Sequence, residues 1–459
     1  MNHRLPAALC CLCVVFLLLG CSGGKTQNEA ASEGAFSIPV EYFTLKNGLK
    51  VVLSQDKTTP TVVVAVYYNI GFRIEPRDRT GFAHLFEHMM FQGSANLGKM
   101  EFIKLVQQNG GVLNGSTRFD FTNYFEVMPA HKLETALWAE ADRMKGLEIT
   151  QDNLTNQQGV VKNEVKVNVL NQPYGGFPWL DMPQFANENW YNAHNFYGDL
   201  ADLDSAKLED VDSFFKTYYA PNNAALVVVG DFEIADARKW IEQYYDSIPP
   251  ATLPSKPDLT EPKQSQEKRK VKEDKLANKP ALAVAYKMPE RNTPEYYAMG
   301  LIDQILLQGQ DSKLYSKLVQ EKGYTDNVSG GINYLGNMFN YNGPMVWMAD
   351  LIYDQSVAAD SILKVVDDAV AELSNISKED TDLAIVKLRS DFYNTVGGNN
   401  VGRADLLAVF ALFDNDPSRI NKLEDEFRKV TPELIRKTAA EYLAPSNRSI
   451  LIVDPKAPQ

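Results

Sequence analysis

Two histidines and a glutamate stand at a spacing that could hold and use a metal ion. In the segment Gly81–Met90, His84 and His88 are four residues apart, and Glu87 lies between them. Residues four apart on a helix project from the same side, so both imidazoles could bind one divalent metal, and zinc suits such nitrogen ligands. Glu87 lies one turn after His84, where it could reach a metal-bound water and act as a general base. The segment therefore predicts a zinc centre for hydrolysis.

A catalytic zinc centre needs a third protein ligand and one open position. Beyond the motif and the N-terminal segment, the histidines that remain are His131 and His194. His131 stands at a predicted helix start, where a surface position is expected, and His194 lies in a loop-like stretch. Glu164, within Val160–Val165, is the better candidate. The residue types alone do not decide between these alternatives.

The motif must be carried by a helix for both imidazoles to converge. Apolar residues at Phe82, Leu85, Phe86 and Met89 fall at helical spacing and predict a helix with one buried stripe. Further along, Val112–Val127 alternates in hydrophobicity, which is typical of a hairpin.

Together these motifs resemble those of the pitrilysin family of metallopeptidases, which includes insulin-degrading enzyme and the mitochondrial processing peptidase. H-x-x-E-H is the inverted zincin signature. The likeness covers nearly the whole mature chain and is greatest for bacterial members with two lobes per chain. The matching segments are His84–His88, Asn109–Gly111, Gln157–Glu164, Pro173–Gly175 and Tyr219–Asn223.

The resemblance implies one Zn²⁺ per chain, held by His84, His88 and Glu164, with Glu87 activating the water. Glu164 follows His84 at the distance that the family's third ligand keeps. Many members carry a second acidic residue, facing the site, seven positions before that ligand. Gln157 stands there in this chain, which keeps polarity but loses charge. The implied activity is that of a zinc metalloendopeptidase acting on peptides or unfolded segments.

The resemblance also suggests how a substrate is held. In the family, the region of Asn114, Gly115 and Ser116 is an edge strand beside the zinc. An extended peptide can add to such an edge, with main-chain hydrogen bonds supplying sequence-tolerant affinity. The alternative is a core hairpin with a turn near Asn114, and the two interpretations are compatible.

An internal repeat organises the chain into two lobes. Tyr218–Asn223 and Tyr442–Asn447 share a pattern, each preceded by a helical segment and followed by a buried strand. Strands and helices mix in both halves, which favours an α+β fold. We expect a zinc-binding catalytic lobe at 37–250, a linker at 251–264 and a second lobe at 265–459. The resemblance implies two homologous lobes in tandem that form half of a clam-shell chamber.

The second lobe contains no histidine, so it cannot repeat the zinc site. It resembles the family's inactive lobe, which implies a role in substrate binding. Many active relatives carry an Arg and, seven residues later, a Tyr in this lobe. Val319 and Asp326 stand at those positions here, and neither can replace its counterpart. Lys322 or Tyr324 is the alternative, if the loop is shifted by a residue or two. We therefore expect a heterodimer with a homologous chain that supplies the Arg and Tyr, or else a homodimer. A non-catalytic or partner-dependent peptide-binding subunit is the alternative function.

The N-terminal segment predicts export and lipid anchoring. An apolar run at residues 5–19 follows Arg4 and ends at Leu18-Leu19-Gly20-Cys21, which resembles a bacterial lipobox. We expect a signal peptide at 1–20, lipidation at Cys21 and a flexible tether at 21–36. Lipoproteins retained in the inner membrane usually carry Asp after the cysteine, whereas Ser22 stands there in this chain. We therefore expect an outer-membrane lipoprotein of the cell envelope, on the periplasmic face.

Composition narrows the function further. No cysteine follows Cys21, so thiol catalysis and cysteine zinc sites are excluded from the mature chain. The formal net charge of -13 disfavours nucleic acid as a partner, because phosphate backbones are repelled. A hydrophobic content of 44% is enough for sizeable cores.

Overall fold

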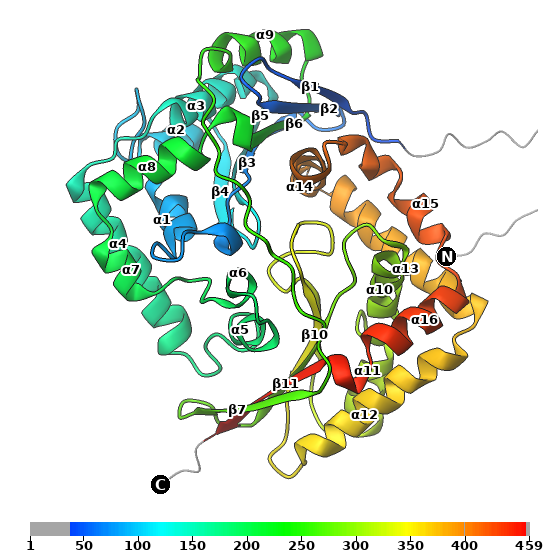
Figure 1. Ribbon diagram of the computed structural model, residues 1–459. Helices are drawn as coiled ribbons and strands as arrows, with labels where there is room; N and C mark the ends of the chain where they lie inside the picture. Colours follow the sequence, from blue (N-terminus) through cyan, green and yellow to red (C-terminus); the bar gives the residue numbers. More distant parts are fainter. Residues whose placement is uncertain (1–36, 399, 456–459) are drawn as a thin grey trace, which may run out of the picture. The chain divides into compact units, whose positions relative to one another are not determined.

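The computed structural model describes residues 37–398 and 400–455, and the chain from Ile38 onward forms one compact unit. Two sheets organise this unit (Figure 1). The six strands of the first sheet are β1 (Glu41–Thr44), β2 (Lys50–Gln55), β3 (Thr61–Tyr68), β4 (Val112–Thr117), β5 (Thr122–Pro129) and β6 (Ala224–Gly230). The five strands of the second are β7 (Lys268–Asp274), β8 (Ala281–Lys287), β9 (Ser329–Ile332), β10 (Val346–Ile352) and β11 (Arg448–Pro455).

The two sheets have matching orders. The first runs β1-β2-β6-β3-β5-β4 and the second β7-β11-β8-β10-β9. In the first sheet, the parallel pair β2–β6 is followed by antiparallel pairs out to the edge strand β4. In the second sheet, the parallel pair β7–β11 is followed in the same way out to the edge strand β9. The central strands β3 and β6 are rich in valine and almost wholly buried. Such β-branched side chains favour the extended backbone and fill both faces of a covered strand.

Helices cover both sheets. Those of the first half are α1 (Phe82–Met89), α2 (Glu101–Gln108), α3 (Leu133–Lys145), α4 (Gln151–Val165), α5 (Asp181–Ala186), α6 (Trp190–Ala193), α7 (Leu200–Ser205), α8 (Leu208–Tyr218) and α9 (Ile234–Tyr245). Those of the second half are α10 (Pro294–Leu306), α11 (Lys313–Tyr315), α12 (Ala359–Ala371), α13 (Lys378–Gly397), α14 (Val401–Val409), α15 (Leu423–Arg428) and α16 (Pro432–Tyr442).

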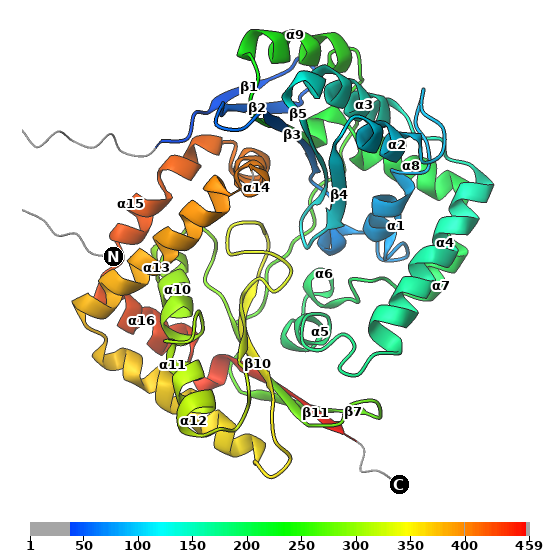
Figure 2. The ribbon, with the colours of Figure 1, turned by 180° about the vertical axis from the view of Figure 1, so that it is seen from behind.

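Each sheet has one face covered by a helix from the other half of the chain. Helix α14 packs on β3 and β6 of the first sheet, where Leu407 joins a core with Val63 and Val227. In the same way, α5 packs on β8 and β11 of the second sheet, where Met182 joins a core with Ala283. Figures 1 and 2 show α14 beside the strands of the first sheet from both sides. Each half therefore buries apolar surface that it could not cover alone.

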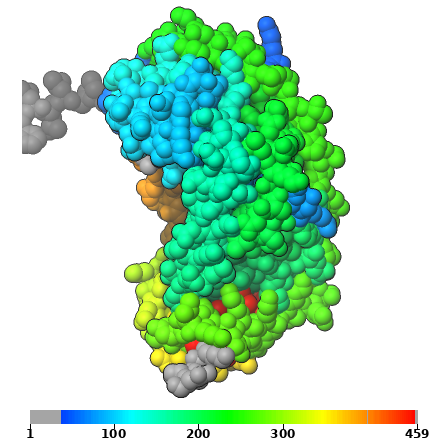
Figure 3. Space-filling model, turned by 90° about the vertical axis from the view of Figure 1, so that its left-hand side faces the viewer, coloured from blue at the N-terminus to red at the C-terminus, as the bar shows by residue number. Residues whose placement is uncertain are grey.

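The space-filling view shows the same continuity at the surface. In Figure 3, atoms of the first half and those of the second half meet on the side where α4 and α7 lie. Between the sheets, residues 247–267 form no helix or strand. This stretch contains the predicted linker.

The expected α+β class and the tandem of two related halves are confirmed. The hairpin predicted within Val112–Val127 corresponds to β4 and β5, and the buried strands expected after the two repeats are β6 and β11. The boundaries of the catalytic lobe, linker and second lobe stay predictions. The signal peptide, Cys21 and the tether lie outside the described residues. Within the described residues, none of the helices has the length and apolar character needed to cross a bilayer.

Candidate metal centre

Helix α1 carries the H-x-x-E-H motif and is fixed at its N-terminus by a buried carboxylate. Glu75 accepts hydrogen bonds from the backbone N–H groups of Gly81, at 2.9 Å, and Ala83, at 2.6 Å. These N–H groups have no partner within the helix, so the carboxylate satisfies them and complements the helix dipole. Burial raises the pKa of Glu75, while His194 beside it, with Nε2 at 3.7 Å, opposes that shift.

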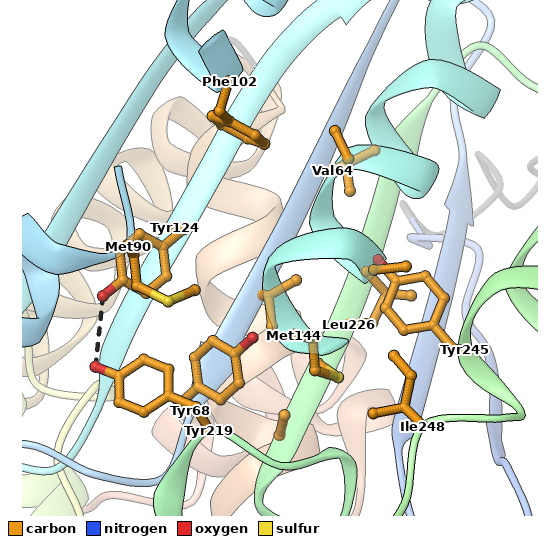
Figure 4. Close-up of a cluster of buried hydrophobic side chains, with 14 of the residues drawn as sticks. Val64, Tyr68, Met90, Phe102, Tyr124, Met144, Tyr219, Leu226, Tyr245 and Ile248 are labelled. Atoms are coloured by element: carbon orange, nitrogen blue, oxygen red, sulfur yellow. Dashed lines mark hydrogen bonds between the residues drawn. The ribbon is translucent and has the colours of Figure 1, made fainter. Parts of the chain in front are cut away.

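The predicted stripe of α1 is buried as expected, at Phe82, Leu85, Phe86 and Met89. Behind it, the Tyr124 hydroxyl on β5 donates to the Phe86 carbonyl at 3.1 Å and lies 3.4 Å from the Tyr219 hydroxyl. Figure 4 shows both tyrosines within the apolar core of this half. The core therefore anchors one side of α1 and leaves its histidine side facing α4.

The three predicted ligands lie together, although α1 and α4 are far apart in the sequence. Nε2 of His84 is 3.3 Å from Nε2 of His88. The Glu164 carboxylate on α4 lies 3.6 Å from Nε2 of His84 and 3.3 Å from Nε2 of His88. Hydrogen bonds with these two histidines hold the pKa of Glu164 well below its usual range. Figures 1 and 2 both place α1 between α4 and β4.

These separations fit a tetrahedral zinc site. Ligand atoms placed 2.0–2.2 Å from a tetrahedral centre lie roughly 3.3–3.6 Å from one another. Among the described residues, His84, His88 and Glu164 form the group whose ligand atoms could share one ion. Two imidazole nitrogens and one carboxylate are a ligand set that catalytic zinc uses, with a fourth position left for water or substrate.

Glu87 is held beside the ligands by a hydroxyl. Thr117, at the end of β4, donates from Oγ1 to Oε2 of Glu87 at 2.7 Å. The bond engages Oε2, and among the described residues no hydrogen bond to the other carboxylate oxygen, Oε1, competes with a proton from water. The carboxylate thus has an orientation suited to a general base, and the edge strand itself supplies the group that orients it.

Tyr197 completes the surroundings and was not predicted. Its hydroxyl donates to Oε1 of Glu164 at 3.5 Å, and its ring meets the His84 ring edge to face, with centroids 5.1 Å apart. Burial and the Glu164 charge raise the pKa of Tyr197 to about 12. The loop reaches α1 because Gly198, with φ at +84°, approaches the Cα of Gly81 so closely that a side chain would collide. An aromatic residue in a loop gives no sequence signal for this role.

The other candidates lie away from the ligands or behind them. His131 is exposed on a short 3₁₀ turn, as expected for a surface residue. His194 is buried, stacks on Trp190 and faces Glu75. Gln157 is buried on α4, two turns before Glu164 and on the same side of that helix. It remains a candidate neighbour of the site by position.

The predicted substrate-binding residues lie on an edge strand. Asn114, Gly115 and Ser116 belong to β4, which pairs with β5 on one side only. Asn114 is exposed, and Gly115 and Ser116 are half-buried. The alternative turn near Asn114 is not where the chain reverses, because the reversal falls at residues 118–121. A free edge at this place could accept another strand.

An α+β fold of two matching halves with H-x-x-E-H on the first helix defines a class of zinc-dependent peptidases. Two family models match the chain: Insulinase (Peptidase family M16) over residues 50–184 and Peptidase M16 inactive domain over residues 205–388. The chain belongs to the M16 peptidase family, as its motifs predicted.

Individual relatives agree with this assignment. The zinc protease PqqE of Helicobacter pylori is 26% identical over 429 residues, which cover 90% of this chain and 93% of that protein. A crystal structure of a protease from Helicobacter pylori matches with a TM-score of 0.83 and 25% identity, over 92% of this chain and 100% of that one. A peptidase M16 inactive domain from Pseudomonas fluorescens shares the fold, with a TM-score of 0.79, 19% identity and coverage of 92% and 99%.

Proposed function

We propose that this chain is a zinc metalloendopeptidase that hydrolyses peptides or unfolded segments. The observation that carries the proposal is the convergence of His84, His88 and Glu164, with Glu87 oriented beside them by Thr117. The zinc-protease name of a relative that spans nearly the same length supports it. Gln157 and the edge strand β4 would support the ligands and the substrate.

Each residue of the site would have one task in the reaction. Zinc bound by His84, His88 and Glu164 would supply a Lewis acid that polarises the scissile carbonyl and acidifies water. Glu87 would take the proton from the attacking water and return it to the leaving amine. Tyr197, whose hydroxyl is protonated at neutral pH and donates to Oε1 of Glu164, would hold Glu164 in place. An extended substrate would add to β4 beside these groups.

Chelation is the direct test of this function. The purified chain should carry about one zinc, and should cut quenched fluorescent peptides only while the metal is bound. Treatment with a chelator should abolish cleavage, and stoichiometric zinc should restore it. Folding of the metal-free chain is checked by circular dichroism. Cleavage that persists at full rate in zinc-free protein would contradict the proposal.

The second half provides a reason to propose that a partner is needed for full activity. Val319 is half-buried against the core of that half, and Asp326 is exposed in the loop before β9. Neither offers the hydrogen-bond donors that the family's Arg and Tyr supply. A homologous chain in a heterodimer, or a second copy of this chain, would provide them. This observation also supports the alternative of a subunit without activity of its own.

Co-expression separates these possibilities. We expect the lone chain to cleave peptides on the order of a hundredfold more slowly than a pair with a homologous chain that carries the Arg and Tyr, because transition-state contacts would be missing. Cleavage rates of the lone chain, the pair and a pair with that Arg replaced by Ala measure the effect. Full activity of the lone chain, unchanged by the partner, would rule out a divided site.

We also propose that the protein is an outer-membrane lipoprotein of the bacterial cell envelope, on the periplasmic face. The proposal depends on the lipobox-like sequence ending at Cys21. A mature N-terminus mapped to another residue, without lipid, would remove the anchor and leave only export.

A further inference from the structure

The second half contains a counterpart of the metal-binding region. The order β3-α1-α2-β4-β5-α3-α4 in the first half is repeated as β8-α10-α11-β9-β10-α12-α13 in the second. Helix α10 therefore corresponds to α1, α13 to α4, and the edge strand β9 to β4. The second half has no histidine in these elements, so the corresponding place cannot repeat the two-histidine metal site.

A cavity of about 500 Å³ lies where those three elements meet. Asp303 and Gln304 of α10, Asp391 of α13, and Gly331 and Asn333 at β9 are among its lining residues. Gly331 has a φ of +134°, and a Cβ there would lie 3.1 Å from the Gln308 amide nitrogen, which donates to Asp303, and 3.6 Å from the Asp303 carboxylate itself. Glycine thus leaves room beside these two side chains.

The cavity presents hydrogen-bond acceptors that lack donors. Gln304 and Asn333 are each more than nine-tenths buried, and in the part of the chain that the structure describes their side-chain oxygens have no partner. Their amide nitrogens are engaged: Gln304 donates to Asp391 at 3.2 Å, and Asn333 donates to the Asn337 carbonyl at 3.0 Å. The side-chain oxygens therefore remain for a ligand, and an unsatisfied buried acceptor is costly.

Two aspartate side chains lie beside these acceptors. Asp303 lies at the base, where it accepts from Trp347 Nε1 at 2.7 Å, and Asp391 lies exposed at the mouth. Burial raises the pKa of Asp303 to about 7, although hydrogen bonds from Trp347 and Gln308 oppose the rise. Lys387 lies beside the cavity, and three acceptors already engage its ammonium: the backbone carbonyls of Gln304, at 3.3 Å, and Gln308, at 2.7 Å, and the Asp311 carboxylate.

The arrangement suits an organic cation better than a metal ion. Within the described ranges, the group of three carboxylate or imidazole ligands close enough for one ion is the one on α1 and α4, not this one. The cavity also has many times the volume of an ion. A guanidinium group carries five N–H donors in a planar fork and a permanent positive charge, which matches several acceptors spread over one cavity.

We propose that this cavity is a specificity subsite that binds an arginine side chain of the peptide substrate, an inference that rests on the proposed peptidase function. The guanidinium would donate to Gln304, Asn333 and Asp303, with Asp391 at the entrance. A substrate held at β4 by its main chain would then be selected by a basic residue at a distance from the cleaved bond. The net negative charge of the chain would attract basic residues anywhere in a peptide, and so would not produce a preference for arginine at one position.

Paired peptides test the subsite without cleavage. The Glu87→Gln variant, loaded with zinc, is titrated with fluorescent peptides that carry one arginine at successive positions. Each peptide is matched by one with citrulline, which keeps the shape but replaces the guanidinium by a neutral urea. Fluorescence anisotropy should show binding about tenfold or more tighter for arginine at one or two neighbouring positions, as a charged hydrogen-bond network implies.

Variants of the cavity should remove this preference. Asp303→Asn keeps an acceptor for Trp347, and Asp391→Asn changes an exposed residue, so at least one is expected to fold like the wild type. Asp382→Asn is the matched control, because it makes the same charge change on the exposed surface of α13. Loss of the arginine preference in the cavity variants, with the control unchanged, supports the subsite.

Two results would overturn the proposal: no position that prefers arginine, or an equal loss of preference in the Asp382→Asn control. Wild-type hydrolysis of the citrulline peptides, followed in parallel, reports separately on the peptidase function. Cleavage without arginine preference would rule out the subsite and leave the proposed peptidase function standing. An arginine preference without any cleavage would keep the subsite and remove the proposed enzyme.

Discussion

Replacing Glu87 by Gln is expected to lower peptide hydrolysis by about 10²–10⁴-fold while zinc remains bound. Gln keeps the size of the side chain and can still accept from Thr117, but it cannot take a proton from water. Because His84, His88 and Glu164 are unchanged, the metal content should stay at the wild-type level. Hydrolysis rates and zinc content measured on one preparation give both quantities.

The matched control is Asp152→Asn, which removes a negative charge from an exposed position on α4. It should leave both rate and zinc content near wild type. A Glu87→Gln protein that cleaves at the wild-type rate would show that another group is the base. Loss of zinc in that variant would instead show that Glu87 helps to hold the metal.

Replacing Leu407 by Ala is expected to lower the free energy of unfolding by about 2–5 kcal/mol. Leu407 of α14 is 0% exposed and packs in the core that covers the first sheet. Its removal leaves a cavity between two halves of the chain, so both halves should lose stability together. Denaturant unfolding measures the change, and hydrogen exchange at β3 and β6 shows whether the first sheet is affected.

Leu383→Ala is the matched control, since Leu383 lies on the neighbouring helix α13 but is 55% exposed. Its effect should stay within about 0.5 kcal/mol. If Leu407→Ala speeds exchange in the second half but leaves the first sheet protected, the two halves would be energetically separate. The packing of a helix from one half on the sheet of the other half would then contribute little to stability.

Several parts of the site were predictable because their signals are local. His84, Glu87 and His88 fall within two turns of a helix whose apolar stripe is plain, so their common side followed from spacing alone. The buried strand expected after Tyr218–Asn223 was equally clear, and it is β6, because β-branched residues such as its valines fill buried strands.

Glu164 illustrates the limit of such reasoning. It stands on another helix, 80 residues after His84, and residue types left His131 and His194 as alternatives. Only the likeness to a family selected it, and only the packing of α4 against α1 places its carboxylate within 3.3 Å of His88. His194 proved to face Glu75, a contact between segments that have no common pattern.

The sequence by itself determined the motif helix, the buried strands, the mixed fold and the absence of histidine from the second half. Tertiary structure alone decided the rest: the Glu75 cap, the Tyr197 contact, the orientation of Glu87 by Thr117, and the covering of each sheet by a helix of the other half. The physical reason is the range of the interactions. Helical and strand periodicity are set by neighbours along the chain, whereas these contacts depend on which surfaces meet after the chain has folded.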